Sequence, residues 1–152
     1  MADAALAALI ERVQDARATQ TPLNLVGGGT KAFYGEAAAG EPLELRALSG
    51  ISSHEPSELV VTVRAGTLLS DLEAALAAHG QCLPFEPPRF APGGTVGGMV
   101  AAGLAGPARA VAGGVRDYVL GATLLTGRGE LLSFGGQVMK NVAGYDLSLI
   151  HI

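Results

Sequence analysis

Cysteine is almost absent from this chain, since Cys82 is the only one in 152 residues. One cysteine cannot form an internal disulfide, and it excludes a zinc site built on cysteines. Basic residues are also scarce, because ten Lys and Arg against fourteen Asp and Glu give a net charge of −4. Nucleic acid is therefore not an expected partner, since binding to a phosphate backbone needs a basic face.

Long hydrophobic runs are missing as well. No apolar stretch reaches the length of a transmembrane span, and early charges together with Asp3 argue against a secretory leader. With the single cysteine, this favours a reducing cytoplasmic compartment. His54, His79 and His151 have no metal-ligand spacing, and His79 suits a structural place at a helix end, where a positive charge meets the dipole. The sequence predicts no metal site and names no catalytic residue.

Glycine, in contrast, is abundant. The 22 glycines cluster at 27–29, 93–106, 113–114 and 135–136, each time beside an apolar run. Apolar residues make up 49% of the chain and charged residues 16%, which is typical of a globular protein with a real core. Close approach of the backbone to a large flat ligand requires glycines. Tight turns between short strands would require a similar number, so both interpretations stay open here.

The most informative stretch is residues 23–31, an apolar run followed by Gly27, Gly28, Gly29, Thr30 and Lys31. The apolar part suits a buried strand. Successive N–H groups without side chains between them form a nest that binds anions, and the threonine hydroxyl and the lysine charge can add to it. The stretch predicts a cradle for phosphate or pyrophosphate, with a ligand-free turn as the alternative.

Two familiar phosphate motifs do not fit this cradle. A Walker loop requires Gly-Lys-Ser/Thr after four free positions, whereas here Thr30 precedes Lys31. The looser dinucleotide pattern requires a helix that starts at the glycines, and Gly35, Gly40 and Pro42 leave no room for one. We therefore expect a loop between two strands, which disfavours NAD and favours another phosphate-bearing cofactor.

Hydrophobic periodicity gives the order of elements in the first half. A helix is expected from residue 3 to about 18 with Asp3 as its N-cap, and another from about 68 to 79 with Ser70 and Glu73 as a capping box. Strands are expected over 23–26, 43–48 and 59–65. The result is a small α/β unit with the glycine loop at the end of a strand.

The second half is less regular. Prolines make 84–92 a stiff extended crossing, and 93–103 contains almost nothing larger than valine, which lets a backbone lie flat against a helix, a sheet or a ligand. Strands are expected over 119–126 and 130–134, joined by a hairpin turn with an αL residue. The mixed polar run 140–147 suits a ligand wall better than a core.

Together these pieces resemble the FAD-binding domain of the vanillyl-alcohol oxidase and p-cresol methylhydroxylase (PCMH) type. Residues 26–31 look like its pyrophosphate loop, 92–98 like its second flavin-contacting loop, and 115–121 like the strand after it. Within that family, Met-Lys-Asn-Val-Ala-Gly-Tyr-Asp-Leu at 139–147 is most similar to the FAD-binding subunit of bacterial glycolate oxidase, also called glycolate dehydrogenase.

The resemblance implies an α+β fold with two lobes after an N-terminal helix over 1–21: a small α/β lobe at about 22–90, and an incomplete lobe with a mixed or antiparallel sheet at about 91–147. The implied FAD contacts are Gly27, Gly28, Gly29, Thr30, Lys31, Pro92, Gly94, Thr95, Gly97, Gly98 and Asn141. Many relatives hold FAD covalently through a histidine in or beside the glycine loop. Thr30 and Lys31 occupy those places here, so non-covalent FAD is expected.

The implied activity is oxidation of glycolate, a small 2-hydroxy acid, to glyoxylate. Electrons would pass to partners, namely a second flavin subunit and an iron–sulfur subunit, through which the protein could sit peripherally at the inner membrane. The alternatives are the flavin domain of another 2-hydroxy-acid dehydrogenase and a non-catalytic FAD-binding scaffold subunit.

The sequence departs from the family pattern after residue 147. The family continues with a glycine-rich stretch and a substrate-binding cap, whereas this chain runs Ser-Leu-Ile-His-Ile over 148–152. We expect 148–152 to be a non-native tail. The substrate side would then be missing, and we expect the chain to be inactive alone.

Overall fold

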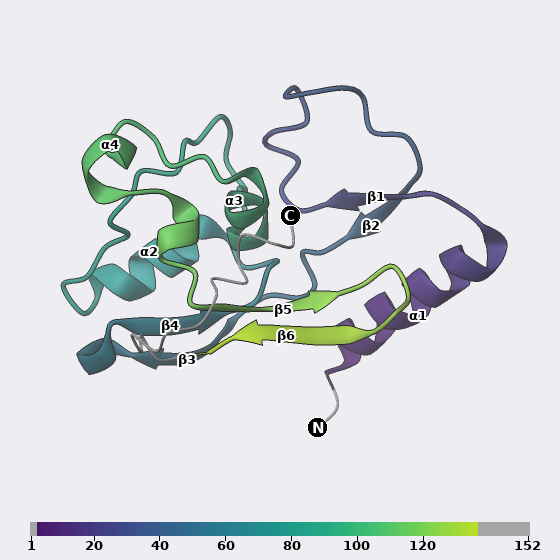
Figure 1. Ribbon diagram of the computed structural model, residues 1–152, viewed down its shortest axis with the longest axis horizontal. Helices are drawn as coiled ribbons and strands as arrows, with labels where there is room; N and C mark the ends of the chain where they lie inside the picture. The colour runs from purple at the N-terminus through teal and green to yellow at the C-terminus, as the bar shows by residue number, and fades with distance from the viewer. Residues whose placement is uncertain (1–2, 137–152) are drawn as a thin grey trace.

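The computed structural model describes residues 3–136, so Asn141, the 139–147 motif and the 148–152 tail lie outside the described residues. Five helical or strand elements form the first part of the described chain: α1 (Ala4–Thr19), β1 (Leu23–Val26), β2 (Glu41–Glu44), β3 (Ile51–Glu55) and η1 (Pro56–Glu58). Seven more follow: β4 (Val60–Val63), α2 (Leu69–Ala77), α3 (Val96–Ala102), α4 (Arg109–Ala112), η2 (Val115–Asp117), β5 (Gly121–Leu125) and β6 (Leu131–Gly135). Figure 1 shows their arrangement.

The first helix forms where its periodicity predicts it. Asp3 caps α1, because its side chain accepts a hydrogen bond from the Leu6 N–H at 3.4 Å. Leu9, Val13 and Ala16 lie at helical spacing and are buried, while Gln20 ends the helix in the left-handed conformation at φ 55°. A carboxylate cap and one apolar stripe are thus enough to set the limits of this helix.

The apolar face of α1 packs against the parallel pair β1–β2, in which Leu23 pairs with Glu41 and Val26 with Glu44. The predicted strand at 43–48 is displaced to Glu41–Glu44. The Leu45 N–H still bonds to the Val26 carbonyl at 2.9 Å, but the Leu48 N–H then bonds back to the Leu45 carbonyl at 3.0 Å, which turns the chain. The alternation of apolar residues at 43–48 therefore continues beyond Glu44, where the observed strand β2 ends.

Strands β3 and β4 form an antiparallel pair with a register shift between Ile51 and Ser53. The apolar pattern predicts β4 but not β3, because Ile-Ser-Ser-His-Glu has little apolar alternation. Helix α2 begins and ends close to the predicted residues, but the predicted capping box is wrong. Leu68 is the N-cap and no side chain caps the helix. Instead, the Leu69 N–H donates to the Gly94 carbonyl at 2.9 Å.

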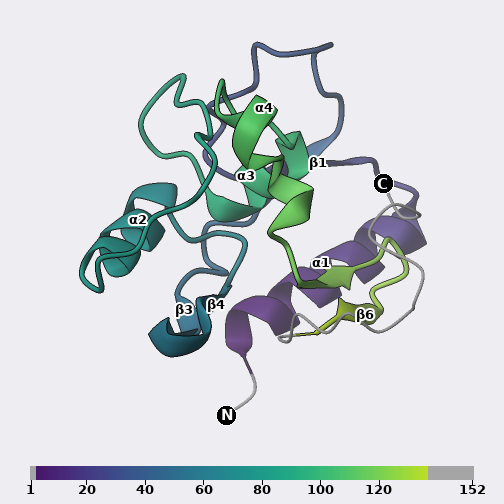
Figure 2. The ribbon, with the colours of Figure 1, turned by 60° about the vertical axis from the view of Figure 1, so that its left-hand side comes forward.

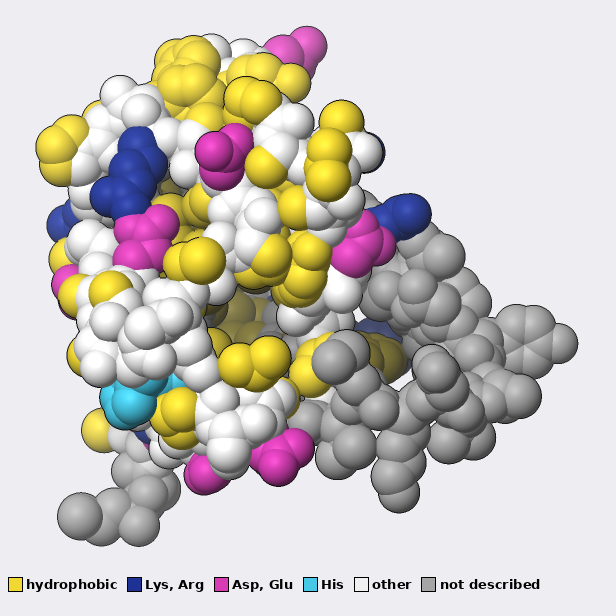
Figure 3. Space-filling model, turned by 90° about the vertical axis from the view of Figure 1, so that its left-hand side faces the viewer, with side chains coloured by type: hydrophobic (Ala, Val, Ile, Leu, Met, Phe, Trp, Pro, Cys, Tyr) yellow, Lys and Arg dark blue, Asp and Glu magenta, His cyan; other side chains and the backbone are white. Residues whose placement is uncertain are grey.

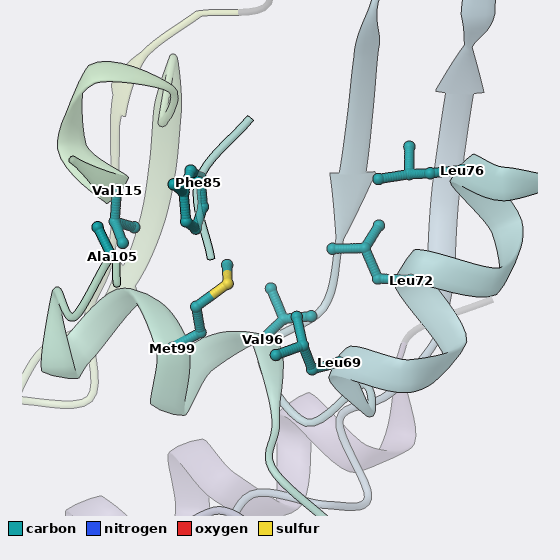
Figure 4. Packing of buried hydrophobic residues seen from close by; sticks show 8 residues of the cluster. All are labelled: Leu69, Leu72, Leu76, Phe85, Val96, Met99, Ala105 and Val115. Atoms are coloured by element: carbon teal, nitrogen blue, oxygen red, sulfur yellow. The ribbon is translucent and has the colours of Figure 1, made fainter. Parts of the chain in front are cut away.

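A second core joins α2 and α3 to the segments that follow each of them (Figure 4). Its buried residues are Leu69, Leu72, Leu76, Phe85, Val96, Met99, Ala105 and Val115. Val61 and Val63 of β4 pack against this cluster. In Figure 4, Leu69 and Val96 meet where the two helices approach, while Phe85 and Val115 lie on the far side of Met99. This packing fixes the start of α3, next to the second glycine-rich segment.

The predicted strand over 115–121 is wrong for its first part. The Gly114 N–H donates to the Asp117 carboxylate at 2.7 Å, and the Tyr118 N–H donates to the Val115 carbonyl at 3.1 Å. These local bonds make a 3₁₀ turn, and β5 begins only at Gly121. Arg116 and Asp117 form the expected exposed ion pair at 3.8 Å.

The β5–β6 hairpin confirms its prediction, with Gly129 in the αL turn position at φ 77°. Leu125 packs against the cluster that includes Leu9 and Val13, so the hairpin lies beside α1, as Figures 1 and 2 show. The lobe limits at 22–90 and 91–147 stay predictions. Among residues 3–136, no helix combines the length and the apolar character needed to cross a membrane.

Candidate functional site

Two glycine-rich segments that are far apart in the sequence line one cavity of about 400 Å³. One segment is the loop that connects β1 to β2 without a helix, as predicted. The other leads into α3. The lining residues are Thr30, Lys31, Leu69, Ser70, Pro88, Arg89, Ala91, Pro92, Gly93, Gly94 and Thr95. The structure thus brings together Thr30 and Lys31 with Pro92, Gly94 and Thr95, all singled out from sequence.

Gly27 and Gly28 do not line this cavity but hold the two segments together. A Cβ on Gly28 would overlap the carbonyl oxygen of Gly93, and a Cβ on Gly27 would lie 2.6 Å from the Thr95 Oγ1. At both glycines, the added Cβ would lie closer to an oxygen atom than a carbon–oxygen contact allows. Only glycine at both positions permits this approach, which supplies a structural reason for the first glycine run.

The turn that follows the glycines leaves several N–H groups free. The carbonyls of Gly29 and Lys31 accept from the Ala32 N–H at 3.1 Å and the Tyr34 N–H at 2.9 Å. The N–H groups of Gly28, Gly29, Thr30 and Lys31, in contrast, donate to no other residue within 3–136. Successive unpartnered N–H groups beside a cavity have the character of an anion-binding nest.

The second segment is fixed by its main chain. The Val96 N–H donates to the Thr67 carbonyl at 2.9 Å, and the Gly97 N–H donates to the Ala65 carbonyl at 2.8 Å. The buried Thr95 caps α3, because its Oγ1 accepts from the Gly98 N–H at 3.2 Å. Val96 to Gly98 therefore form the first turn of a helix, and Gly97 and Gly98 are not among the residues that line the cavity.

Three cations lie around the two segments. Lys31 lines the cavity, and a guanidinium nitrogen of Arg46 lies 2.8 Å from the position that a Cβ on Gly93 would take. Neither forms an ion pair with another residue of 3–136, whereas Arg89 at the cavity pairs with Glu73 of α2. No sequence pattern marks Arg46, because it lies in a stretch that looks like an ordinary half-buried strand. The unpaired cations make this part of an acidic protein favourable for an anion.

The comparisons with known proteins agree with this geometry. A model of the family described as "FAD binding domain" matches residues 4–135. The glycolate oxidase subunit GlcE of Escherichia coli (strain K12) is 52% identical over 145 residues, which cover 95% of this chain and 41% of that protein. A D-lactate dehydrogenase of Archaeoglobus fulgidus is 33% identical over 138 residues, covering 86% of this chain and 29% of that protein. The chain therefore spans less than half the length of these relatives.

Among solved structures, Phl p 4.0202, a glucose dehydrogenase, has a TM-score of 0.70 at 17% identity, covering 85% of this chain and 27% of that one. The 6-hydroxy-D-nicotine oxidase of Arthrobacter nicotinovorans has a TM-score of 0.66 at 19% identity, covering 84% and 27%. At such identities the likeness concerns the fold alone. It confirms the α+β class expected from the sequence.

Proposed function

The chain belongs to the FAD-binding domain family, and from this premise we propose that its two glycine-rich segments hold the pyrophosphate of FAD without a covalent bond. The family match confirms the resemblance to an FAD domain and makes FAD the cofactor. In this proposal the contacts come from residues 27–31 and from Pro92, Gly94 and Thr95, with Gly97 and Gly98 contributing through the position of α3. Asn141 remains a proposed contact outside the described residues.

The single observation that carries the proposal is the row of unpartnered N–H groups at residues 28–31, of which Thr30 and Lys31 line the cavity. Phosphate oxygens are acceptors and carry negative charge, so they can satisfy these donors and also attract Lys31 and Arg46. Thr30 brings a hydroxyl to the same cavity. The donor set therefore fits a pyrophosphate better than it fits an uncharged ligand.

When bound, FAD supplies the electron-accepting chemistry, and the chain supplies binding, orientation and the local field. The glycines keep the two segments in contact, the nest fixes the phosphates, and the main-chain bonds of residues 94–97 fix the start of α3. The described residues thus act by binding and positioning. The catalytic residues stay unassigned.

For the whole protein, we infer oxidation of glycolate to glyoxylate, in a complex with a second flavin subunit and an iron–sulfur subunit. Identity to a protein named as a subunit of glycolate oxidase supports this inference. A cytoplasmic location, with peripheral attachment to the inner membrane through partners, is part of the same proposal. We expect this chain alone to lack glycolate oxidation.

A second candidate is the flavin domain of a different 2-hydroxy-acid dehydrogenase. The relatives named D-lactate dehydrogenase and D-2-hydroxyglutarate dehydrogenase favour it, because lactate and 2-hydroxyglutarate carry the same 2-hydroxy acid group as glycolate. A non-catalytic scaffold subunit remains the third possibility. Flavin reduction by glycolate, D-lactate and D-2-hydroxyglutarate separates these functions when measured in the full-length protein, alone and with its partner subunits.

Titration of the purified chain with FAD tests the cofactor proposal directly. We expect one FAD per chain, seen as a shift of the flavin absorption band and a change in flavin fluorescence. Inorganic pyrophosphate should compete with FAD, because the proposed cradle recognises the phosphates. An absence of FAD binding by a folded chain, or binding that excess pyrophosphate leaves unchanged, would contradict the proposed cradle.

A further inference from the structure

The two segments that line the cavity contact each other both at their glycines and through a pair of aromatic rings. Gly28 lies against the Gly93 carbonyl. The ring of Phe33 meets the ring of Phe90, with centroids 4.9 Å apart and planes at 76°. Between these contacts, Thr30 and Lys31 on one segment and Ala91 and Pro92 on the other line the cavity. Neither ring lines the cavity, but Phe90 lies between the lining residues Arg89 and Ala91, and Phe33 follows Lys31 by two residues, so the ring contact lies beside the cavity.

The aromatic contact has no explanation in the core. Phe33 is 65% exposed and Phe90 48% exposed, and neither belongs to the two hydrophobic clusters of residues 3–136. Tyr34, also exposed, stands edge-on to Phe33 at 6.4 Å. Figure 3 shows hydrophobic side chains at the top of the molecule, the level at which Figure 1 places the loop after β1. Exposed apolar rings that contact each other beside a cavity suggest a function connected with that cavity.

The glycine contact and the ring contact differ in how firmly the surrounding structure holds them. Gly93 is followed by Gly94, whose carbonyl is bonded to the start of α2, and by Thr95, which is buried. Phe33 instead sits in a loop whose residues 32–40 are all exposed, held locally by the two turns at Gly29 and Lys31. Of the two contacts, the one between the rings is thus the one that can open and close again.

We propose that Phe33 and Phe90 form an aromatic latch, which closes the cavity after the phosphates have entered and slows their release. This inference rests on the proposed binding of FAD pyrophosphate. The two rings are positioning residues, because they act by holding residues 30–31 against residues 91–92. An edge-to-face pair in this geometry is strong enough to change a release rate constant by about two- to tenfold.

Release of FAD tests the latch with a readout that does not require enzyme activity. We expect Phe33→Ala and Phe90→Ala each to raise the rate constant for FAD dissociation, followed by flavin fluorescence after dilution, by about two- to tenfold. Because either change removes the same contact, the double variant should release FAD no faster than the more severe single variant. Phe90→Tyr keeps a ring at this place and should restore slow release.

Val111→Ala is the matched control, since Val111 is 96% exposed and lies outside both segments. It should leave the release rate constant unchanged. Wild-type release rates in Phe33→Ala and Phe90→Ala, in a chain that binds FAD normally, would overturn the latch while leaving the proposed function intact.

Amide hydrogen exchange, measured on the chain without FAD, is a second test of the latch. Loss of the latch should speed exchange of the two hydrogen-bonded amides of the loop after β1, those of Ala32 and Tyr34, in Phe90→Ala by at least about twofold, with no change in the Val111→Ala variant. If the wild-type chain failed to bind FAD, the proposed function would fall, and faster exchange would still support the closing contact. Unchanged exchange in Phe90→Ala would overturn the latch whether or not FAD binds.

Discussion

Gly28 lies so close to Gly93 that any side chain at residue 28 would overlap the Gly93 carbonyl oxygen. This contact connects the loop after β1 to the segment before α3. A short glycine run therefore has two tasks, because residues 27 and 28 join the segments while residues 28–31 keep their N–H groups unpartnered up to the cavity, which Thr30 and Lys31 line.

Gly28→Ala should separate the two glycine-rich segments. The new methyl group must displace backbone atoms, and inserting a methyl group into a packed contact typically costs about 1–3 kcal/mol. We expect a lower thermal unfolding midpoint together with weaker FAD binding. Gly127→Ala is the control, because Gly127 has no atom within 4 Å of its Cβ position and its φ is not positive. Equal stability and equal FAD affinity in the two variants would contradict the contact.

Lys31→Ala and Arg46→Ala should each weaken FAD binding without unfolding the chain. Arg46 is exposed and Lys31 half-buried, and both lack an ion-pair partner within residues 3–136, so each loss should raise the FAD dissociation constant by about two- to fivefold. The effect should shrink at high salt, because salt screens exposed charges. Arg17→Ala, on α1 and away from the cavity, should change nothing. An unchanged FAD content in Lys31→Ala would remove that residue from the site.

Thr67→Val should destabilise the fold more than its shape suggests. The Thr67 hydroxyl is buried, donates to the Gly50 carbonyl at 3.1 Å and accepts from the Gly50 N–H at 2.9 Å. Valine keeps the shape but takes the partner from the Gly50 N–H, while the Gly50 carbonyl keeps its bond from the Arg64 N–H at 3.0 Å, so we expect a cost of about 1 kcal/mol in the free energy of unfolding. Thr123→Val on the exposed face of β5 is the control and should stay within about 0.5 kcal/mol. Denaturant unfolding of both variants measures the difference.

All bound flavin should leave the protein on denaturation. The proposed FAD is non-covalent, because the glycine loop carries Thr30 and Lys31 and no histidine, while His54 and His79 pack against each other at 4.8 Å and neither lines the cavity. His79 has the structural position expected of it, with its Nδ1 3.2 Å from the Ala75 carbonyl. Acid precipitation followed by absorption of the supernatant measures released flavin. Flavin that stays with the pellet would show a covalent bond.

Local sequence predicts those parts of the fold that local chemistry decides. Asp3 followed by an apolar stripe specifies α1, and the αL glycine at 129 specifies the hairpin. The cradle is also predicted from the sequence, because the glycines at 27–29 and the breakers after them exclude a helix. In each case the deciding groups lie within a few residues of one another.

The remaining features depend on groups that are distant in the sequence. The start of α2 is held by the Gly94 carbonyl rather than by the Ser70–Glu73 capping box, so tertiary contact replaces a local cap. Arg46 reaches Gly93 because the chain turns after β2, and no local pattern marks that residue. The polar strand β3 forms because β4 pairs with it, not because its own sequence favours a strand.

The packing of the β5–β6 hairpin on α1 also bears on how the chain folds. Leu125 belongs to the layer that covers Leu9 and Val13, although these residues lie near opposite ends of the described sequence. During synthesis α1 emerges first, and its apolar face lacks this cover until the hairpin leaves the ribosome. Contacts of such long range form late and slowly. Chains interrupted before residue 125 would have that face covered by β1 and β2 alone, and the part left exposed would favour aggregation.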